Sequence, residues 1–190
     1  MTDSAYRSEA GRMAIEELYR QTINKANFPL ESKMVSTSQG ETHIIESGAI
    51  SSPPLILLHG TSSNSATWFA DISSWSKHFR VLAVDLPGEP GLSFNKRMTL
   101  RSDEFSTWMT SLLAELDLPH ISIVGMSLGG WIALDFASRF PGRVKALSLI
   151  APSGLASQRL SFLFKALPLF FLGDWGLQRI NKIVCHKVDM

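Results

Sequence analysis

The residue types and spacing that carry chemistry lie in the stretch ISIVGMSLGGWIALDF, residues 121–136. An apolar run ends at Gly125, and Ser127 stands between Gly125 and Gly129 in a G-x-S-x-G pattern. The pattern follows a predicted strand and opens a predicted helix. The junction between the two is a tight turn that needs neighbours without side chains. Such a turn lifts the hydroxyl clear of the sheet edge, and the start of the helix favours developing negative charge. We therefore interpret Ser127 as a nucleophile rather than a plain turn residue.

A second loop of interest follows another predicted strand, in LILLHGTSSNSATW. After His59 and Gly60 the chain is placed to offer a backbone N–H to an oxyanion. We expect the N–H groups of Thr61 and Leu128 to form a two-donor oxyanion hole, with Ser62 as the alternative to Thr61. His59 is a candidate base, but a base belongs across from the nucleophile, so we expect His59 to shape the loop.

The elements that position these residues alternate between strands and helices. Continuous apolar runs predict strands at LILLHG, RVLAVDLPG, ISIVGMS and VKALSLIAPS. Helical runs are predicted at about residues 65–78, 100–116 and 128–139. Continuous apolar strands are expected when helices cover both faces of a parallel sheet. The sequence therefore predicts an α/β protein with a doubly wound, mostly parallel sheet.

The N-terminal region is predicted to add a helix and a hairpin to this core. An amphipathic helix is expected over residues 8–26, from the helical spacing of Met13, Ile15, Leu18, Tyr19 and Ile23. The run MVSTSQGETHIIESG indicates a β-hairpin that opens the sheet. We expect three regions: a helical extension at 1–30, a core at 31–152, and the start of a helical cap at 153–190.

Four motifs together resemble the α/β-hydrolase family, in particular its small carboxylesterase-like members with a helical cap. They are PLILLHG followed by Thr61, VDLPGEPGLS, VGMSLGG and the closing strand ALSLIAPS, and the match runs from about Pro29 to Pro152. The resemblance implies an eight-stranded, mostly parallel sheet and a Ser-His-acid triad. It also implies hydrolysis of esters or related acyl compounds without a metal or organic cofactor. One difference is a longer turn, GEPG, where the family has G-x-G.

The family places its acid and histidine after the seventh and eighth strands, and six strands are counted here. No strand-like run follows residue 160, so we expect an incomplete fold, truncated within the cap and lacking the triad acid and histidine. His186 and Asp189 are candidates to replace them, but they lie in a polar tail with no strand to fix them. Without a seventh strand, VKALSLI is expected to be an apolar edge strand through which copies of the chain associate.

The other acids and histidines are interpreted as structural or solvated. Asp135 lies two turns into the helix after Ser127 and is expected to be a helix-surface or packing charge. His43, His78 and His120 fall on the hairpin, a helix end and a strand start. No pair of these side chains has the spacing of metal ligands, so no metal site is predicted. Asp174 is expected to belong to the cap.

Composition narrows the classes of function. Among 190 residues, 18 basic and 17 acidic side chains give a net charge of +1, without a basic run dense enough to follow a phosphate backbone. Nucleic acid is therefore not expected as a partner. The N-terminus lacks the apolar segment of a secretory signal, and LSFLFKALPLFFL is shorter than the roughly 20 residues that span a bilayer. With a single cysteine, Cys185, these features predict a cytoplasmic protein without a membrane span.

The first hypothesis is a serine hydrolase acting on a small-molecule ester or related acyl compound. A hydrophobic acyl or alcohol group is suggested by the apolar cap residues Phe162, Phe164, Leu167, Phe170 and Phe171. The alternative is a non-catalytic binding or scaffold protein that keeps the hydrolase body. Cofactor-free haloperoxidases and carbon–carbon hydrolases use the same serine turn, whereas a dehalogenase would carry an aspartate in place of Ser127.

Overall fold

The computed structural model describes residues 4–154 and residue 179. The chain divides into two units, Met1–Ser153 and Gly154–Met190. The first unit holds the sheet and its helices. Most of the predicted cap, residues 155–178 and 180–190 with His186 and Asp189, lies outside the described residues. In the part of the chain that is described, no helix combines the length and apolar character needed to cross a membrane.

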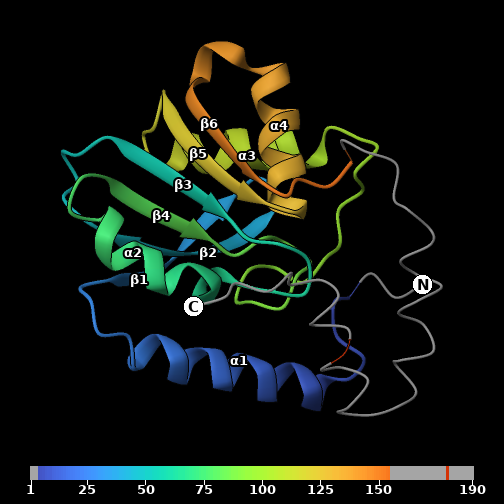
Figure 1. Cartoon of the computed structure of the whole chain (residues 1–190). Helices are drawn as coiled ribbons and strands as arrows, with labels where there is room; N and C mark the ends of the chain where they lie inside the picture. Colours follow the sequence, from blue (N-terminus) through green and yellow to red (C-terminus); the bar gives the residue numbers. More distant parts are fainter. Residues whose placement is uncertain (1–3, 155–178, 180–190) are drawn as a thin grey trace. The chain divides into compact units, whose positions relative to one another are not determined.

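The first unit is built on a six-stranded sheet with the order β1-β2-β4-β3-β5-β6 (Figure 1). Its strands are β1 Glu31–Thr37, β2 Gly40–Ser47, β3 Pro54–Leu58, β4 Arg80–Val84, β5 Ile121–Met126 and β6 Val144–Ile150. The first two strands form the predicted hairpin, and β2 also pairs antiparallel with β4. The pairs β4–β3, β3–β5 and β5–β6 are parallel. The predicted doubly wound, mostly parallel sheet is thus confirmed.

Helices cover both faces of this sheet (Figure 1). They are α1 Glu9–Asn24, α2 Phe69–Trp75, α3 Glu104–Glu115 and α4 Leu128–Arg139, with short 3-10 turns at Ser65–Trp68 and Pro141–Arg143. The third helix begins later than the predicted residue 100. There the Glu104 N–H donates to the Ser102 hydroxyl at 3.2 Å, a local bond that competes with helix formation before this point.

Two apolar cores result, one on each face of the sheet. The core under α3 and α4 includes Ile56, Leu58, Leu82, Val84, Trp108, Leu112, Ile132 and Phe136. The core under α1 and α2 includes Tyr19, Ile23, Ile45, Leu55, Leu57, Trp68, Ile72 and Val81. Successive residues of β3 and β4 therefore face opposite cores, which explains why these strands are continuous apolar runs.

One sequence-based expectation about packing was wrong in part. Of the five apolar positions in α1, only Tyr19 and Ile23 are buried; Met13, Ile15 and Leu18 are 62%, 41% and 65% exposed. The helix therefore packs through a narrower stripe than its sequence suggests. As expected, β6 lies at one edge of the described sheet, and it contains no buried residue.

Candidate active site

Ser127 forms the junction between β5 and α4, with φ of 50° and ψ of −112°. Residues with side chains rarely adopt positive φ, and such strain persists only where the surroundings impose it. The Ser127 N–H donates to the Ile150 carbonyl at 3.0 Å, and the Ser127 carbonyl accepts from the Ser153 N–H at 3.0 Å. The end of β6 therefore holds this turn from both sides.

The glycines around Ser127 allow a very close approach of backbone segments. A Cβ added to Gly125 would lie 2.5 Å from the Gly129 carbonyl oxygen, and one added to Gly129 would lie 2.2 Å from that of Leu58. The Gly129 N–H also donates to the His59 carbonyl at 3.1 Å. No side chain fits at either glycine while α4 begins directly against β3 and β5.

The two predicted oxyanion donors belong to loops that meet beside Ser127. A Cβ built on Gly60 would be 3.4 Å from the Ser127 Cβ, so the end of the β3 strand lies against the serine. Within the described residues, the backbone N–H groups of Thr61 and Leu128 donate to no other protein atom. Ser62, the alternative donor, is already engaged: its N–H donates to Glu89 Oε2 at 2.6 Å.

A pocket of about 220 Å³ opens next to these loops. It is lined by Thr61, Pro87, Glu89, Arg97, Met98, Leu100, Phe105 and Leu128. Burial raises the pKa of Glu89, and the hydrogen bond from Ser62 and the charge of Arg97 offset this only in part. The pocket therefore presents a largely apolar wall with one carboxyl group and one guanidinium group.

His59 is fully buried and has both ring nitrogens engaged. Its Nε2 accepts from the Leu86 N–H at 2.9 Å, so Nδ1 carries the proton and donates to the Gly60 carbonyl at 2.8 Å. Burial lowers the pKa of His59 more than the charge of Asp85 and the Gly60 carbonyl raise it. A neutral ring that links the β3 and β4 loops agrees with the expected role in shaping the loop, not with a base.

The Ser127 hydroxyl has a partner that sequence reasoning missed. Its Oγ lies 3.2 Å from Ser153 Oγ. Ser153 follows β6, and the carboxyl ends of parallel strands meet at one edge of a sheet, so its place at the end of ALSLIAPS was the available signal. Asp135 is bonded to Arg139 at 2.9 Å along the surface of α4, as expected. The proposed substitutes His186 and Asp189 lie outside the described residues.

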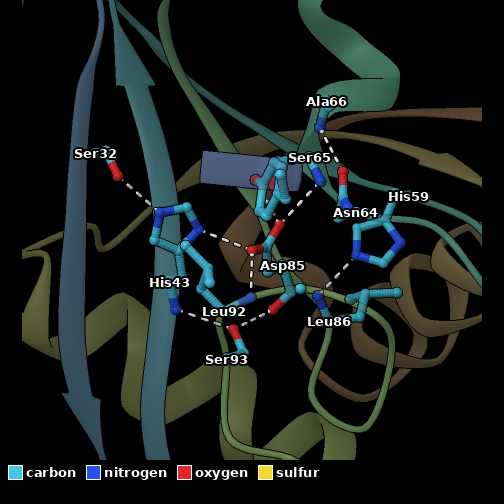
Figure 2. Close-up of polar contacts among 12 residues, drawn as sticks. Ser32, His43, His59, Asn64, Ser65, Ala66, Asp85, Leu86, Leu92 and Ser93 are labelled. Atoms are coloured by element: carbon cyan, nitrogen blue, oxygen red, sulfur yellow. Dashed lines mark hydrogen bonds and ion pairs between the residues drawn. The ribbon is translucent and has the colours of Figure 1, made fainter. Parts of the chain in front are cut away.

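Asp85, directly after β4, is a buried carboxylate that the sequence reading did not single out (Figure 2). It is fully buried and accepts hydrogen bonds from His43 Nδ1 at 2.8 Å, Tyr19 Oη at 3.0 Å, and two backbone N–H groups, of Ser65 at 2.9 Å and Leu92 at 3.0 Å. Burial alone would raise its pKa, but the hydrogen bond from His43, the electrostatic effect of the two neighbouring histidines and the Leu92 N–H together lower it. An aspartate directly after the apolar run VLAV was the signal for this buried carboxylate.

Comparison with known proteins defines the class. The family model described as alpha/beta hydrolase fold matches residues 53–179, a region that contains the Ser127 turn and the Thr61 loop. Together with the strand order described above, this match shows that the chain belongs to the α/β-hydrolase family.

Carboxylesterases are among its relatives. The chain is 38% identical over 138 residues to carboxylesterase YbfK and 33% identical over 139 residues to the uncharacterized carboxylesterase nap, both of Bacillus subtilis. These alignments cover 72% and 71% of this chain and 46% of each relative. The chain therefore spans about half the length of these curated relatives.

Solved structures show the same architecture. Naproxen esterase (carboxylesterase NP) from Bacillus subtilis matches with a TM-score of 0.79 and 28% identity, over 92% of this chain and 61% of that one. Carboxylesterase CesB (YbfK) from Bacillus subtilis matches with a TM-score of 0.79 and 31% identity, over 94% and 62% of the two chains.

Proposed function

We propose that this chain belongs to a serine hydrolase that acts on carboxylic esters or related acyl compounds through Ser127. The observation that supports this most is the strained Ser127 turn. It lies beside two backbone N–H groups, of Thr61 and Leu128, that are not used elsewhere in the described structure. Relatives named carboxylesterase or naproxen esterase support the ester class.

In the proposed reaction, Ser127 Oγ attacks the acyl carbon and its proton passes to a histidine. The Thr61 and Leu128 N–H groups hold the oxyanion of the tetrahedral intermediate. The histidine then protonates the leaving alcohol, and water hydrolyses the acyl-serine by the reverse sequence of proton transfers. The four histidines in the described residues form no hydrogen bond to Ser127. We therefore assign the base to a residue outside the described part of the chain, where His186 is the histidine in the sequence.

The neighbouring pocket suggests where one arm of the ester is bound. Its volume of about 220 Å³ and its Met98, Leu100 and Phe105 lining fit a small apolar acyl or alcohol group.

A binding or scaffold protein is the second candidate, and one observation favours it. Within the described residues, Ser127 Oγ meets Ser153 Oγ, a hydroxyl that cannot act as a general base near neutral pH. In this case the hydrolase body would bind a ligand or partner without turning it over.

A fluorophosphonate probe, followed by peptide mapping, distinguishes these candidates because it reacts with activated serines. We expect covalent labelling of Ser127 in the wild-type chain and none at this position in S127A. Ser138 is a matched control, since it is an exposed serine on α4 whose hydroxyl donates to the Asp135 carbonyl; S138A should label like the wild type. A wild-type chain that is not labelled at Ser127 would contradict the hydrolase and favour the scaffold.

Self-association is a further part of the proposal. In the described structure β6 is an edge strand, and its free backbone groups are available for pairing with a second copy. The predicted small-molecule ester substrate is part of the hydrolase proposal, and the predicted cytoplasmic location stays a prediction.

A further inference from the structure

We propose that Ser32, His43 and Asp85 form a second nucleophilic serine site, separate from Ser127. Ser32 Oγ lies 2.8 Å from His43 Nε2, and His43 Nδ1 lies 2.8 Å from Asp85 Oδ2 (Figure 2). Serine, imidazole and carboxylate are thus joined in the order of a Ser-His-Asp triad. Such a triad is recognised by geometry and roles, not by position in the sequence.

The partners of the His43 ring fix its tautomer. Nδ1 faces the Asp85 carboxylate, which only accepts hydrogen bonds, so Nδ1 carries a proton. In a neutral imidazole the other nitrogen, Nε2, is then the acceptor, and the Ser32 hydroxyl donates to it. This is the arrangement in which a histidine can take a proton from a serine.

Its surroundings hold this chain of groups rigidly. Asp85 is fixed by three further donors, as described above, and the His43 ring packs edge-on against Tyr19 with ring centroids 5.8 Å apart. The backbone N–H of His43 donates to Ser93 Oγ at 2.9 Å, and Ser93 Oγ donates to the backbone carbonyl of Asp85 at 2.6 Å. The base is therefore oriented before any substrate arrives, which is the condition for efficient proton transfer.

The nucleophile of this site is open to solvent although its partners are not. Ser32 is exposed, whereas His43 is only 2% exposed and Asp85 is fully buried. A pocket of about 230 Å³ is lined by Ser32 together with Arg20, Ile23, Asn24 and Leu92. This volume suits a small ester. Arg20 and Asn24 carry the side-chain N–H groups of the lining and are the candidate donors to an oxyanion.

This site is distinct from the one at Ser127. Ser32 belongs to β1, and three strands, β2, β4 and β3, lie between β1 and the β5 strand that leads to Ser127. In the described structure, no hydrogen bond joins the Ser32, His43 and Asp85 group to Ser127. Reaction at Ser32 therefore does not depend on the proposed function of Ser127.

Hydrolysis of a small ester at this site proceeds in two stages, acylation of Ser32 and hydrolysis of the acyl-serine. Ser32 Oγ bonds to the acyl carbon while its proton moves to His43 Nε2; the carbon–oxygen bond to the alcohol then breaks, and the alcohol leaves with that proton. Water adds to the acyl-serine, gives a proton to Nε2, and releases the carboxylic acid as Ser32 regains its proton. Ser32 and His43 are the catalytic residues, and Asp85 is a positioning residue.

Fluorophosphonate labelling of the S127A chain tests this site directly. Ser32 Oγ would bond to phosphorus, fluoride would leave, and the hydroxyl proton would pass to His43. The control is Ser36, an exposed serine of the same strand whose hydroxyl donates to Glu41 Oε1 instead of a histidine. We expect Ser32 to be labelled about 10²-fold faster than Ser36, the usual contribution of a general base.

Peptide mapping shows which serine carries the label. Label on the Ser32 peptide of S127A that disappears in S127A/S32A and persists in S127A/S36A supports the second site. Absence of label on Ser32, or equal labelling of Ser32 and Ser36, overturns it whether or not Ser127 reacts in the wild type. Conversely, label on Ser32 without label on Ser127 contradicts the proposed hydrolase function and leaves the second site standing.

Discussion

At the scale of single residues, hydrogen bonds already made determine which groups are free to meet a substrate. Sequence left both Thr61 and Ser62 as candidates for the first oxyanion donor. In the structure Ser62 gives its N–H to Glu89, and Thr61 gives its N–H to no described residue. The sequence could not make this distinction, because it depends on where the Glu89 side chain turns within the longer GEPG loop.

Glu89 is therefore predicted to hold the oxyanion loop in place. Ser62 has φ of 57°, a strained conformation that needs outside support. E89A removes its acceptor, so we expect faster hydrogen exchange at the Ser62 amide and about tenfold slower labelling of Ser127, the effect of losing about 1.4 kcal/mol of a charge-assisted hydrogen bond.

The conservative variant E89Q provides the control. Its amide oxygen can still accept the Ser62 N–H, so exchange and labelling should stay close to those of the wild type. Unchanged Ser62 exchange in E89A would show that Glu89 does not hold the loop. Faster exchange at Ser62 combined with normal labelling of Ser127 would show that this contact holds the loop without affecting the chemistry at Ser127.

The ionised Asp85 carboxylate is predicted to make the free energy of unfolding depend on pH. Burial alone would raise its pKa, but the His43 interaction lowers it below the ordinary 3.8, so the folded state binds fewer protons than the unfolded state. Its contribution to stability is thus present above pH 3.8 and is lost as the pH falls through the lower, folded value. We expect D85N to lower the free energy of unfolding by about 3–5 kcal/mol near neutral pH, since it leaves buried donors unpaired.

Urea unfolding across a pH series measures this effect. The difference between D85N and the wild type should narrow as the pH falls below 3.8. The control is D103N, because Asp103 is exposed and its side chain makes no capping hydrogen bond. A pH-independent difference would show that the ionised state of Asp85 is not what stabilises the fold.

At the scale of elements, the junctions between strand and helix depend on backbone contacts. The sequence predicted α4 with its observed ends, because glycines precede it and Pro141 and Gly142 follow it. It did not predict that α3 starts at Glu104, since the delay depends on local hydrogen bonds made by Ser102. Nor did it predict Ser153, whose contact with Ser127 joins two strand ends that are far apart in the sequence.

The start of α4 is predicted to tolerate no side chain at Gly129. A Cβ there would lie 2.2 Å from the Leu58 carbonyl oxygen, so G129A must move α4 away from β3. We expect a loss of about 1–3 kcal/mol in the free energy of unfolding, as for other overpacked sites, and loss of Ser127 labelling. The control is G142A, because a Cβ on Gly142 meets no atom within 4 Å. Equal stability of the two variants in urea unfolding would contradict this account.

At the scale of the whole molecule, strand and helix types were predicted correctly from the sequence because both periodic signals were strong. The doubly wound, mostly parallel sheet was also predicted, whereas the strand order comes from the structure. Burial was harder to predict. The apolar residues of β6 read as a covered strand, yet Leu147 and Leu149 are only half-buried and Ile150 is 43% exposed in the described structure. Composition indicates that a strand is apolar but not what covers it.

The exposed edge leads to the last prediction, that this chain self-associates through β6. Free backbone groups along an apolar edge strand favour pairing with a second copy, and a lysine on such an edge opposes it. We expect light scattering to show a molecular mass that rises with protein concentration for the wild type and stays monomeric for A146K, where Ala146 is an exposed residue of β6. S138K adds the same charge on the exposed surface of α4 and should associate like the wild type. A wild-type chain that is monomeric at every concentration would contradict association through this edge, and equal effects of the two lysines would assign association to net charge instead.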